Sequence, residues 1–159
     1  MPRRRRGNSG KGWETQLMAW HATYRRAGKA WVVKTNPPVG VIGSVSNGHF
    51  HGVYTGKGPP DFVGVIGPTG IAVAFDAKDT RASRFDFSQI KAHQAQALDD
   101  CQRAGGICFI ALRFQGRAFV LPWGALGEIY RSDSARSLSA SGVEDLGIPM
   151  TTEGWLQCL

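Results

Sequence analysis

Cysteine is scarce in this sequence of 159 residues. Cys101, Cys108 and Cys158 are odd in number and scattered, and none of them belongs to a C-x-x-C motif. These features exclude a disulfide scaffold and a cysteine-based zinc site, and they are typical of proteins in a reducing compartment. We therefore expect the protein to act in the cytoplasm.

Long apolar runs are missing as well. The longest uncharged stretches, such as 37–54, are broken by Gly, Pro, Ser and Asn. None of them supplies the roughly 20 apolar residues that a membrane-spanning helix needs. The start, Met-Pro-Arg-Arg-Arg-Arg, is followed by no apolar segment, so it does not predict a secretory signal. We expect no membrane association, and the 42% hydrophobic content predicts a globular chain.

Acidic residues are in deficit, since 12 Asp and Glu stand against 19 Lys and Arg, for a net charge of +7. Five of the basic residues lie in the first eleven positions, which hold no acid: Arg3, Arg4, Arg5, Arg6 and Lys11. The remaining 14 basic and 12 acidic residues are nearly balanced. The pattern predicts a flexible basic arm over 1–11 that neutralises phosphates, followed by a single domain over 12–159. A tail that only improves solubility is the alternative.

Hydrophobic periodicity predicts a mixed α/β domain with a central sheet. The predicted elements, in order, are a helix over 13–27, a strand over 30–34, strands over 61–66 and 71–78, a helix over 86–104, strands over 107–114 and 118–121, and a helix over 122–131. The Gly- and Pro-rich segment 37–60 is too long for an ordinary loop, so we expect it to form an irregular hairpin or projecting arm with a function.

Catalytic chemistry is predicted at the second strand of the central hairpin, because alternation places Asp76 and Lys78 on one face. The loop 67–70 sets a register in which paired residue numbers sum to 137, so that Asp61 faces Asp76. Two acids that close repel each other unless a cation lies between them, and oxygen ligands suit Mg²⁺ or Mn²⁺. A loop of odd length would send Asp61 to the opposite face.

A third carboxylate is available on the first helix, where Glu14 lies beside the apolar stripe that faces the core. Lys78 is suited to polarise an attacking water or to steady the charge on a phosphate. Together these residues predict hydrolysis of a phosphodiester by metal-activated water. The alternative is that Asp76 and Lys78 form a solvated pair on an exposed strand.

The chain also resembles a known family. Pro60-Asp61, followed after fourteen residues by Asp76-Ala77-Lys78, spells the PD-(D/E)xK nuclease pattern. Further motifs resemble RecU-type Holliday junction resolvases: Gly-Lys-Gly-Trp-Glu at 10–14, Gly-Val-Tyr-Thr-Gly-Lys-Gly at 52–58, Phe-Asp-Ala-Lys-Asp-Thr at 75–80, His-Gln at 93–94, and Gly-Ile-Cys-Phe at 106–109 with Arg-Phe at 113–114. The resemblance implies a restriction-endonuclease-like central mixed β-sheet flanked by helices, with a stalk projecting between the first two strands. It also implies a homodimer that cuts four-way DNA junctions with Mg²⁺ or Mn²⁺ and uses no organic cofactor.

Carried over by position, the resemblance assigns roles to single residues. It implies metal binding by Glu14, Asp61, Asp76 and the backbone carbonyl of Ala77, and catalytic roles for Lys78 and Gln94. Position 76 is Asp where the family usually has Glu, which keeps the ligand type but shortens its reach.

Segment 37–57 corresponds to the family's stalk, on which two aromatic side chains, Phe50 and Tyr54, are suited to stack on opened bases. Four basic side chains, besides those of the N-terminal arm, are candidates for phosphate contacts: His49, Lys57, Arg81 and Arg84. Two alternatives remain open. One is another PD-(D/E)xK nuclease, of restriction or end-processing type, and the other is an inactive module that only binds branched DNA.

Overall fold

Residues 9–43 and 46–159 are described in a computed structural model of the protein. The basic residues Arg3, Arg4, Arg5 and Arg6 of the predicted arm lie outside the described residues. Within the described part of the chain, no helix combines the length and the apolar character needed to cross a membrane.

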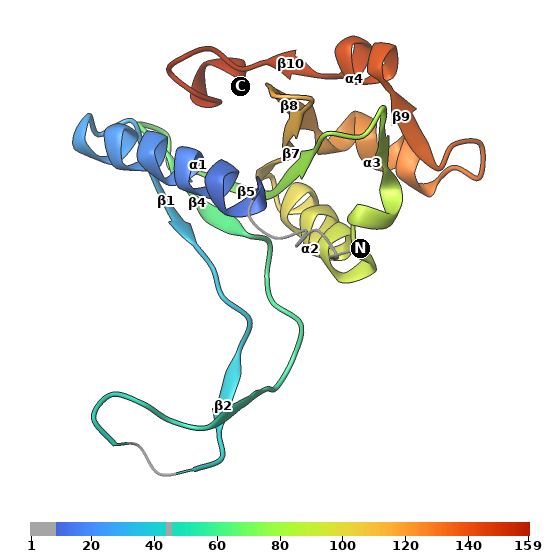
Figure 1. The fold of residues 1–159 in the computed structure, drawn as a ribbon. Coiled ribbons are helices and arrows are strands. Elements are labelled where there is room, and N and C mark those ends of the chain that lie inside the picture. The colour runs from blue at the N-terminus through green and yellow to red at the C-terminus, as the bar shows by residue number, and fades with distance from the viewer. Residues whose placement is uncertain (1–8, 44–45) are drawn as a thin grey trace, which may run out of the picture.

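A six-stranded mixed sheet forms the centre of the fold, which confirms the predicted class (Figure 1). Its strands, in spatial order, are β1 (Ala30–Lys34), β4 (Phe62–Ile66), β5 (Ile71–Thr80), β7 (Ile107–Phe114), β8 (Arg117–Pro122) and β10 (Ile148–Pro149). Only β5 and β7 of these neighbours run parallel, because α2 lies in the connection between them.

Helices cover both faces of this sheet. On one face, α1 (Ser9–Arg26) buries Trp13 and Leu17 against Val73 and Phe75 of β5. On the other face, α2 (Ala92–Arg103) and α3 (Trp123–Arg131) pack against β7, and Leu98 of α2 belongs to the core cluster there. Alternation along β5 therefore separates two cores, so that its side chains face α1 and α2 in turn.

Two helix boundaries differ from the prediction. The first helix begins at Ser9 rather than at residue 13, because Gly10 and Gly12 lie inside the helix and do not end it. The helix predicted over 86–104 is divided into a 3₁₀ turn, Phe87–Gln89, and α2. Asp86 caps the 3₁₀ turn by accepting a hydrogen bond from the backbone N–H of Ser88, and the backbone is extended before α2 begins.

The chain after α3 contains more structure than the sequence predicted. β9 (Ser137–Ser139) pairs with β6 (Arg84–Asp86), and α4 (Ala140–Leu146) follows directly. A short 3₁₀ turn, Leu156–Cys158, comes near the end of the chain. Trp155 is fully buried against the α1 face of the sheet, so the C-terminal segment packs on the core.

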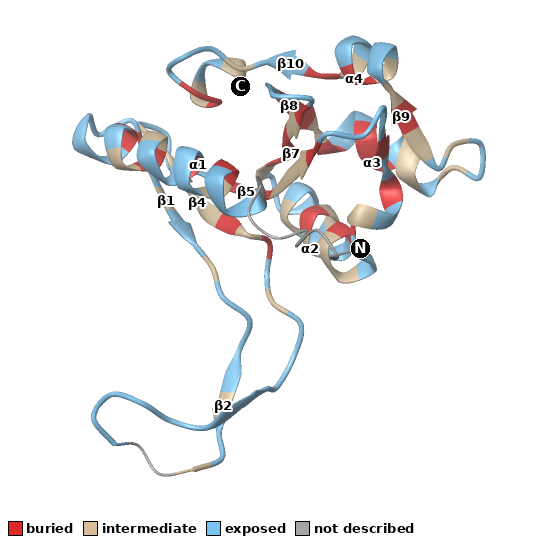
Figure 2. Ribbon diagram, viewed as in Figure 1, coloured by how far each residue is buried: buried red, intermediate tan, exposed pale blue. Residues whose placement is uncertain are grey.

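The predicted projecting arm is present between β1 and β4. It contains a two-stranded ribbon of β2 (Val39–Val41) and β3 (Gly52–Tyr54), with Val39 paired to Tyr54. Figure 1 shows the ribbon extending well away from the sheet, and Figure 2 shows that it is exposed along most of its length. An arm that buries so little apolar surface contributes little to the core, and its exposed aromatic residues are available to a partner.

Candidate active site

The β4–β5 hairpin has the predicted register, in which Phe62 pairs with Phe75 and Ile66 with Ile71. Asp61 directly precedes β4, and its backbone N–H donates a hydrogen bond of 2.8 Å to Oδ1 of Asp76. The sequence-based expectation that Asp61 lies opposite Asp76 is therefore confirmed.

The two aspartates are held by a reciprocal pair of backbone hydrogen bonds. The N–H of Ala77 donates to Oδ2 of Asp61 at 3.0 Å, while the N–H of Asp61 donates to Asp76. Each carboxylate thus uses one oxygen to bind a backbone amide and keeps the other oxygen for a different partner. This arrangement fixes the orientation of both carboxylates without consuming their capacity to bind a cation.

The remaining oxygen of Asp76 is in an unusual position for a charged atom. Oδ2 of Asp76 is sealed from solvent and has no hydrogen-bond partner among the described residues. Its ion-pair partner, Nζ of Lys78, lies 3.9 Å away. A buried carboxylate oxygen that lacks a donor is costly, and a bound cation removes that cost.

The pKa of Asp76 is raised from 3.8 to about 6, chiefly by burial and in second place by the neighbouring Asp61 carboxylate. Lys78 opposes both effects on the pKa of Asp76. Two carboxylates that disfavour each other's charge form an all-oxygen site suited to Mg²⁺ or Mn²⁺, because a divalent cation compensates both charges. The free oxygen of Asp76 therefore fits a divalent metal.

Lys78 is positioned by α2. Its Nζ donates a hydrogen bond of 3.1 Å to Oε1 of Gln94, and the backbone N–H of Lys91 donates to the same oxygen at 3.0 Å. The side chain of Lys78 is only 13% exposed. Gln94 thus connects the first turn of α2 to the candidate site, and it directs the ammonium group of Lys78.

Glu14 lies in a different environment from the two aspartates. It forms an ion pair of 2.9 Å with Lys34 at the end of β1, on the face of the sheet that α1 covers. No three acidic, histidine or cysteine side chains form a potential metal cluster within residues 9–43 and 46–159. Glu14, Asp61 and Asp76 are therefore not gathered as a ready set of three ligands.

Sequence reasoning missed Lys34, although a signal was available. Lys34 pairs with Phe62, which follows Asp61, and the backbone N–H of Thr35 donates to the carbonyl of Asp61 at 2.9 Å. Pairing the predicted strand 30–34 with the strand beginning at 61 brings this lysine close to the candidate site.

Asp79 has a structural role. The guanidinium of Arg113 donates to both of its oxygens, with distances of 3.1 Å to Oδ1 and 2.6 Å to Oδ2. A bidentate pair of this kind satisfies the carboxylate, so Asp79 is not available as a metal ligand.

The predicted DNA contacts lie in three separate regions. His49, Phe50, Tyr54 and Lys57 are exposed on the arm, and Lys11 is exposed in the first turn of α1. Arg81 and Arg84 are exposed just after β5, in the segment that follows Lys78. The Nε of Arg84 donates a hydrogen bond to Oγ of Ser137, so this side chain is already partly engaged.

Several known proteins are similar to this chain. A resolvase, "Holliday junction resolvase RecU" of Ligilactobacillus salivarius, is 25% identical over 163 residues, which cover 89% of this chain and 70% of that protein. The proteins of the same name from Pediococcus pentosaceus and a Geobacillus species are 26% and 27% identical, over 68% and 80% of this chain. The aligned regions span 56% and 61% of those two relatives.

A solved structure is similar in fold. Hjc, a Holliday junction resolvase from Archaeoglobus fulgidus, matches with a TM-score of 0.55 and 18% identity, over 88% of this chain and 95% of that one. This likeness confirms the restriction-endonuclease-like fold class. The family described as recombination protein U matches residues 8–156, which is nearly the whole sequence, and the chain therefore belongs to the RecU family.

Proposed function

We propose that the protein is a metal-dependent endonuclease that resolves four-way (Holliday) DNA junctions by paired, symmetric nicks. Family membership and the names of the relatives support the substrate. One observation carries the chemistry: Asp61 and Asp76 are held by each other's backbone, and Oδ2 of Asp76 is sealed without a hydrogen-bond donor. A carboxylate pair of this kind has little use in a protein that only binds DNA, because phosphates and carboxylates repel each other.

Mg²⁺ or Mn²⁺ is the proposed cofactor. Asp61 and Asp76 would hold the ion through their free oxygens, with the Ala77 carbonyl as a further ligand. Glu14 would join them after leaving its ion pair with Lys34. When bound, a divalent ion supplies a Lewis acid that polarises the scissile phosphate and lowers the pKa of the attacking water.

The protein's own residues perform the remaining steps. Lys78 places its ammonium beside the carboxylate pair, where it stabilises the negative charge that develops on the phosphate during attack. Gln94 keeps that ammonium oriented through the 3.1 Å hydrogen bond. Since the hydrogen bond already exists before substrate binds, little reorganisation of Lys78 is needed.

The projecting arm between β1 and β4 and the basic residues are proposed to hold the DNA. Phe50 and Tyr54 are 50% and 77% exposed, as expected for aromatic side chains that stack on unpaired bases. The basic residues at the N-terminus, on the arm and after β5 would contact phosphates without reading sequence. We propose a homodimer, because paired nicks in two equivalent strands require two sites related by a two-fold axis. The proposed location is the bacterial cytoplasm, for a host or a viral protein.

The direct test compares a synthetic four-way junction with a linear duplex of the same sequence, each in the presence of Mg²⁺. We expect paired nicks in the junction and little cutting of the duplex. Asp61→Asn and Lys78→Ala should bind the junction and leave it uncut. Asp145→Asn is the matched control, because Asp145 is an exposed carboxylate on α4.

The two alternatives give different results in the same assay. Another PD-(D/E)xK nuclease would cut the duplex as well as the junction, or its cutting would depend on the base sequence of the DNA and not on the branched structure. An inactive module would bind the junction with strong salt dependence and give no metal-dependent product. Cutting by Asp61→Asn at the wild-type rate would show that the assigned carboxylates are wrong.

A further inference from the structure

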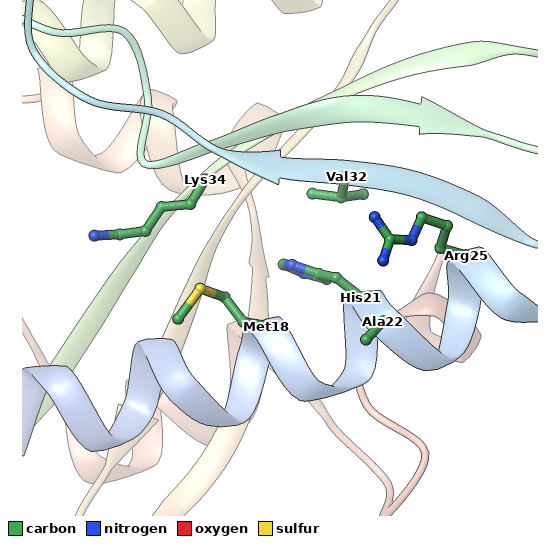
Figure 3. Close-up of a pocket in the computed structure, with 6 residues that line it drawn as sticks. All are labelled: Met18, His21, Ala22, Arg25, Val32 and Lys34. Carbon is green, nitrogen blue, oxygen red and sulfur yellow. The ribbon is translucent and has the colours of Figure 1, made fainter.

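A cavity of about 150 Å³ lies between α1 and β1 (Figure 3). Six residues line it: Met18, His21, Ala22, Arg25, Val32 and Lys34. At about 30 Å³ of liquid volume per water, it has room for about five waters, or for one tetrahedral oxyanion. No carboxylate contributes to this lining.

His21 lines the cavity with a ring whose tautomer is determined by its hydrogen bond. The ring is 5% exposed and packs against Phe62 and Phe75, with centroid distances of 5.0 Å and 5.7 Å. The indole N–H of Trp155 donates to Nε2 of His21 at 3.0 Å. Because an indole nitrogen can only donate, Nε2 must be the accepting nitrogen, and the proton of the neutral ring lies on Nδ1.

The Nδ1–H group of His21 is a donor without a partner among the described residues. Among the described residues, Oδ2 of Asp76 is the sole side-chain nitrogen or oxygen that is sealed from solvent and lacks a hydrogen bond, and Nδ1 of His21 is not such an atom. Nδ1 is therefore not sealed. Figure 3 shows the ring of His21 at the cavity, between Met18 and Val32. Since Nε2 is engaged by Trp155, Nδ1 is the nitrogen that remains to contact a ligand in this cavity.

Two basic side chains, Arg25 and Lys34, line the cavity besides His21. Arg25 is exposed in the last turn of α1, and its guanidinium forms no ion pair within the described residues. Lys34 lies at the opposite end of the cavity, where its ammonium is paired with Glu14. Burial lowers the pKa of His21 to about 4, so the ring is neutral near pH 7 and donates through Nδ1 only. A neutral donor and an available guanidinium are the two elements of an anion site.

We propose that this cavity binds a phosphate group, held by the Nδ1–H of His21 and the guanidinium of Arg25. β1 connects the cavity to the candidate active site, since its residues Val32 and Lys34 line the cavity and Lys34 pairs with Phe62, the neighbour of Asp61. The phosphate is then either one of the DNA backbone close to the scissile bond, a reading that rests on the proposed function, or a free phosphate. The cavity would position the DNA strand without taking part in the chemistry.

The test uses NMR of the full chain labelled with ¹⁵N-histidine, in EDTA, titrated with inorganic phosphate. We expect the Nδ1–H resonance of His21 to shift and to saturate. Arg25→Gln should weaken binding by about tenfold, as expected for the loss of one charge-assisted hydrogen bond. Arg26→Gln is the matched control, because Arg26 carries the same charge in the same helical turn but is not part of the cavity lining. It should bind as the wild type does.

A second variant tests the cavity without changing charge. Ala22→Leu fills the space and should abolish the shift, while the His21 ring keeps its contact with Trp155. The proposal is overturned if phosphate leaves the His21 resonance unmoved, or if Arg25→Gln and Arg26→Gln bind phosphate equally well.

Binding of a four-way junction in EDTA then identifies the source of the phosphate. If the phosphate belongs to DNA, Arg25→Gln should reduce the slope of log K against log salt by about 0.9 relative to Arg26→Gln, the value for one phosphate contact. Equal slopes, together with a saturating phosphate shift, identify a free phosphate as the ligand. Neither measurement depends on metal or on cleavage, so failure of the nuclease assay remains distinguishable from failure of this proposal.

Discussion

Replacement of Asp76 by asparagine is expected to stabilise the metal-free protein while it abolishes cleavage. Asp76 is fully buried, and one of its oxygens lacks a hydrogen-bond donor among the described residues. Its carboxylate therefore weakens the fold in the absence of a cation. The asparagine side chain has nearly the same shape, and its carbonyl oxygen can still accept the N–H of Asp61.

The magnitude follows from the pKa of Asp76, which the fold raises from 3.8 to about 6. The folded protein holds this proton more tightly than the unfolded chain does, so the contribution of Asp76 to stability falls as pH rises from about 4 to about 7. The pKa change corresponds to about 3 kcal/mol of unfolding free energy. This pKa already includes the attraction to Lys78. Burial of the asparagine NH₂ group costs about 1 kcal/mol, so we expect a net gain of about 2 kcal/mol at pH 8, or about 4–8 °C in Tm.

The assay is urea unfolding in EDTA between pH 4 and pH 8, followed by tryptophan fluorescence. The difference in unfolding free energy between variant and wild type should be small near pH 4 and should grow as pH rises. Titrating groups other than Asp61 and Lys78, which interact with Asp76, occur in both proteins and cancel in this difference. Asp79→Asn, the same change three residues along β5, should be destabilising at pH 8 because it breaks the bidentate pair with Arg113. A pH-independent difference, or an Asp76→Asn protein less stable than the wild type at pH 8, would show that the Asp76 carboxylate does not destabilise the metal-free fold.

Three further predictions concern other parts of the molecule. The fold lowers the pKa of His21 from 6.5 to about 4, so the wild type loses unfolding free energy as pH falls through this range. In His21→Phe this acid-induced loss should be smaller by about 3 kcal/mol. An equal loss in the acid unfolding curves of the two proteins would contradict this. Gln94→Ala should slow junction nicking by about tenfold to a hundredfold, because Lys78 loses its orienting acceptor. Gln94→Glu keeps that acceptor and should retain more activity in single-turnover kinetics; equal rates for the two variants would count against the orienting role. Tyr54→Ala and Phe50→Ala should each weaken junction binding by about 1–3 kcal/mol while leaving Tm unchanged, since both side chains are exposed; a large fall in Tm would show that the arm is part of the core.

The sequence predicted those parts of the fold that follow from short periodic segments. The strands Ala30–Lys34 and Ile107–Phe114 have the predicted bounds, because β-branched and apolar residues fill all but one position in each, Lys34 and Arg113 being the exceptions. The loop 67–70 has an even number of residues, which determined the register of the hairpin and therefore the meeting of Asp61 and Asp76.

Tertiary contacts decided the features that the sequence did not predict. The helix expected over 86–104 is interrupted because Phe87 and Ile90 are buried in the core next to α2. The strand Ser137–Ser139 is short and polar, and it exists because β6 pairs with it. Glu14 was expected to reach the carboxylate pair, but it forms an ion pair with Lys34 on the same face of the sheet. No local sequence pattern distinguishes these two possible partners.

Anomalous diffraction from crystals of the protein soaked with Mn²⁺ shows whether Asp61 and Asp76 share a bound divalent ion. We expect one strong peak within about 2.0–2.3 Å of a carboxylate oxygen from both Asp61 and Asp76, the distance expected for an oxygen ligand to a small divalent ion. Crystals of the Asp76→Asn variant, soaked in the same way, should lack that peak. A Mn²⁺ ion bound elsewhere, or no ion between the two aspartates at saturating Mn²⁺, would contradict the proposed metal site and with it the proposed nuclease chemistry.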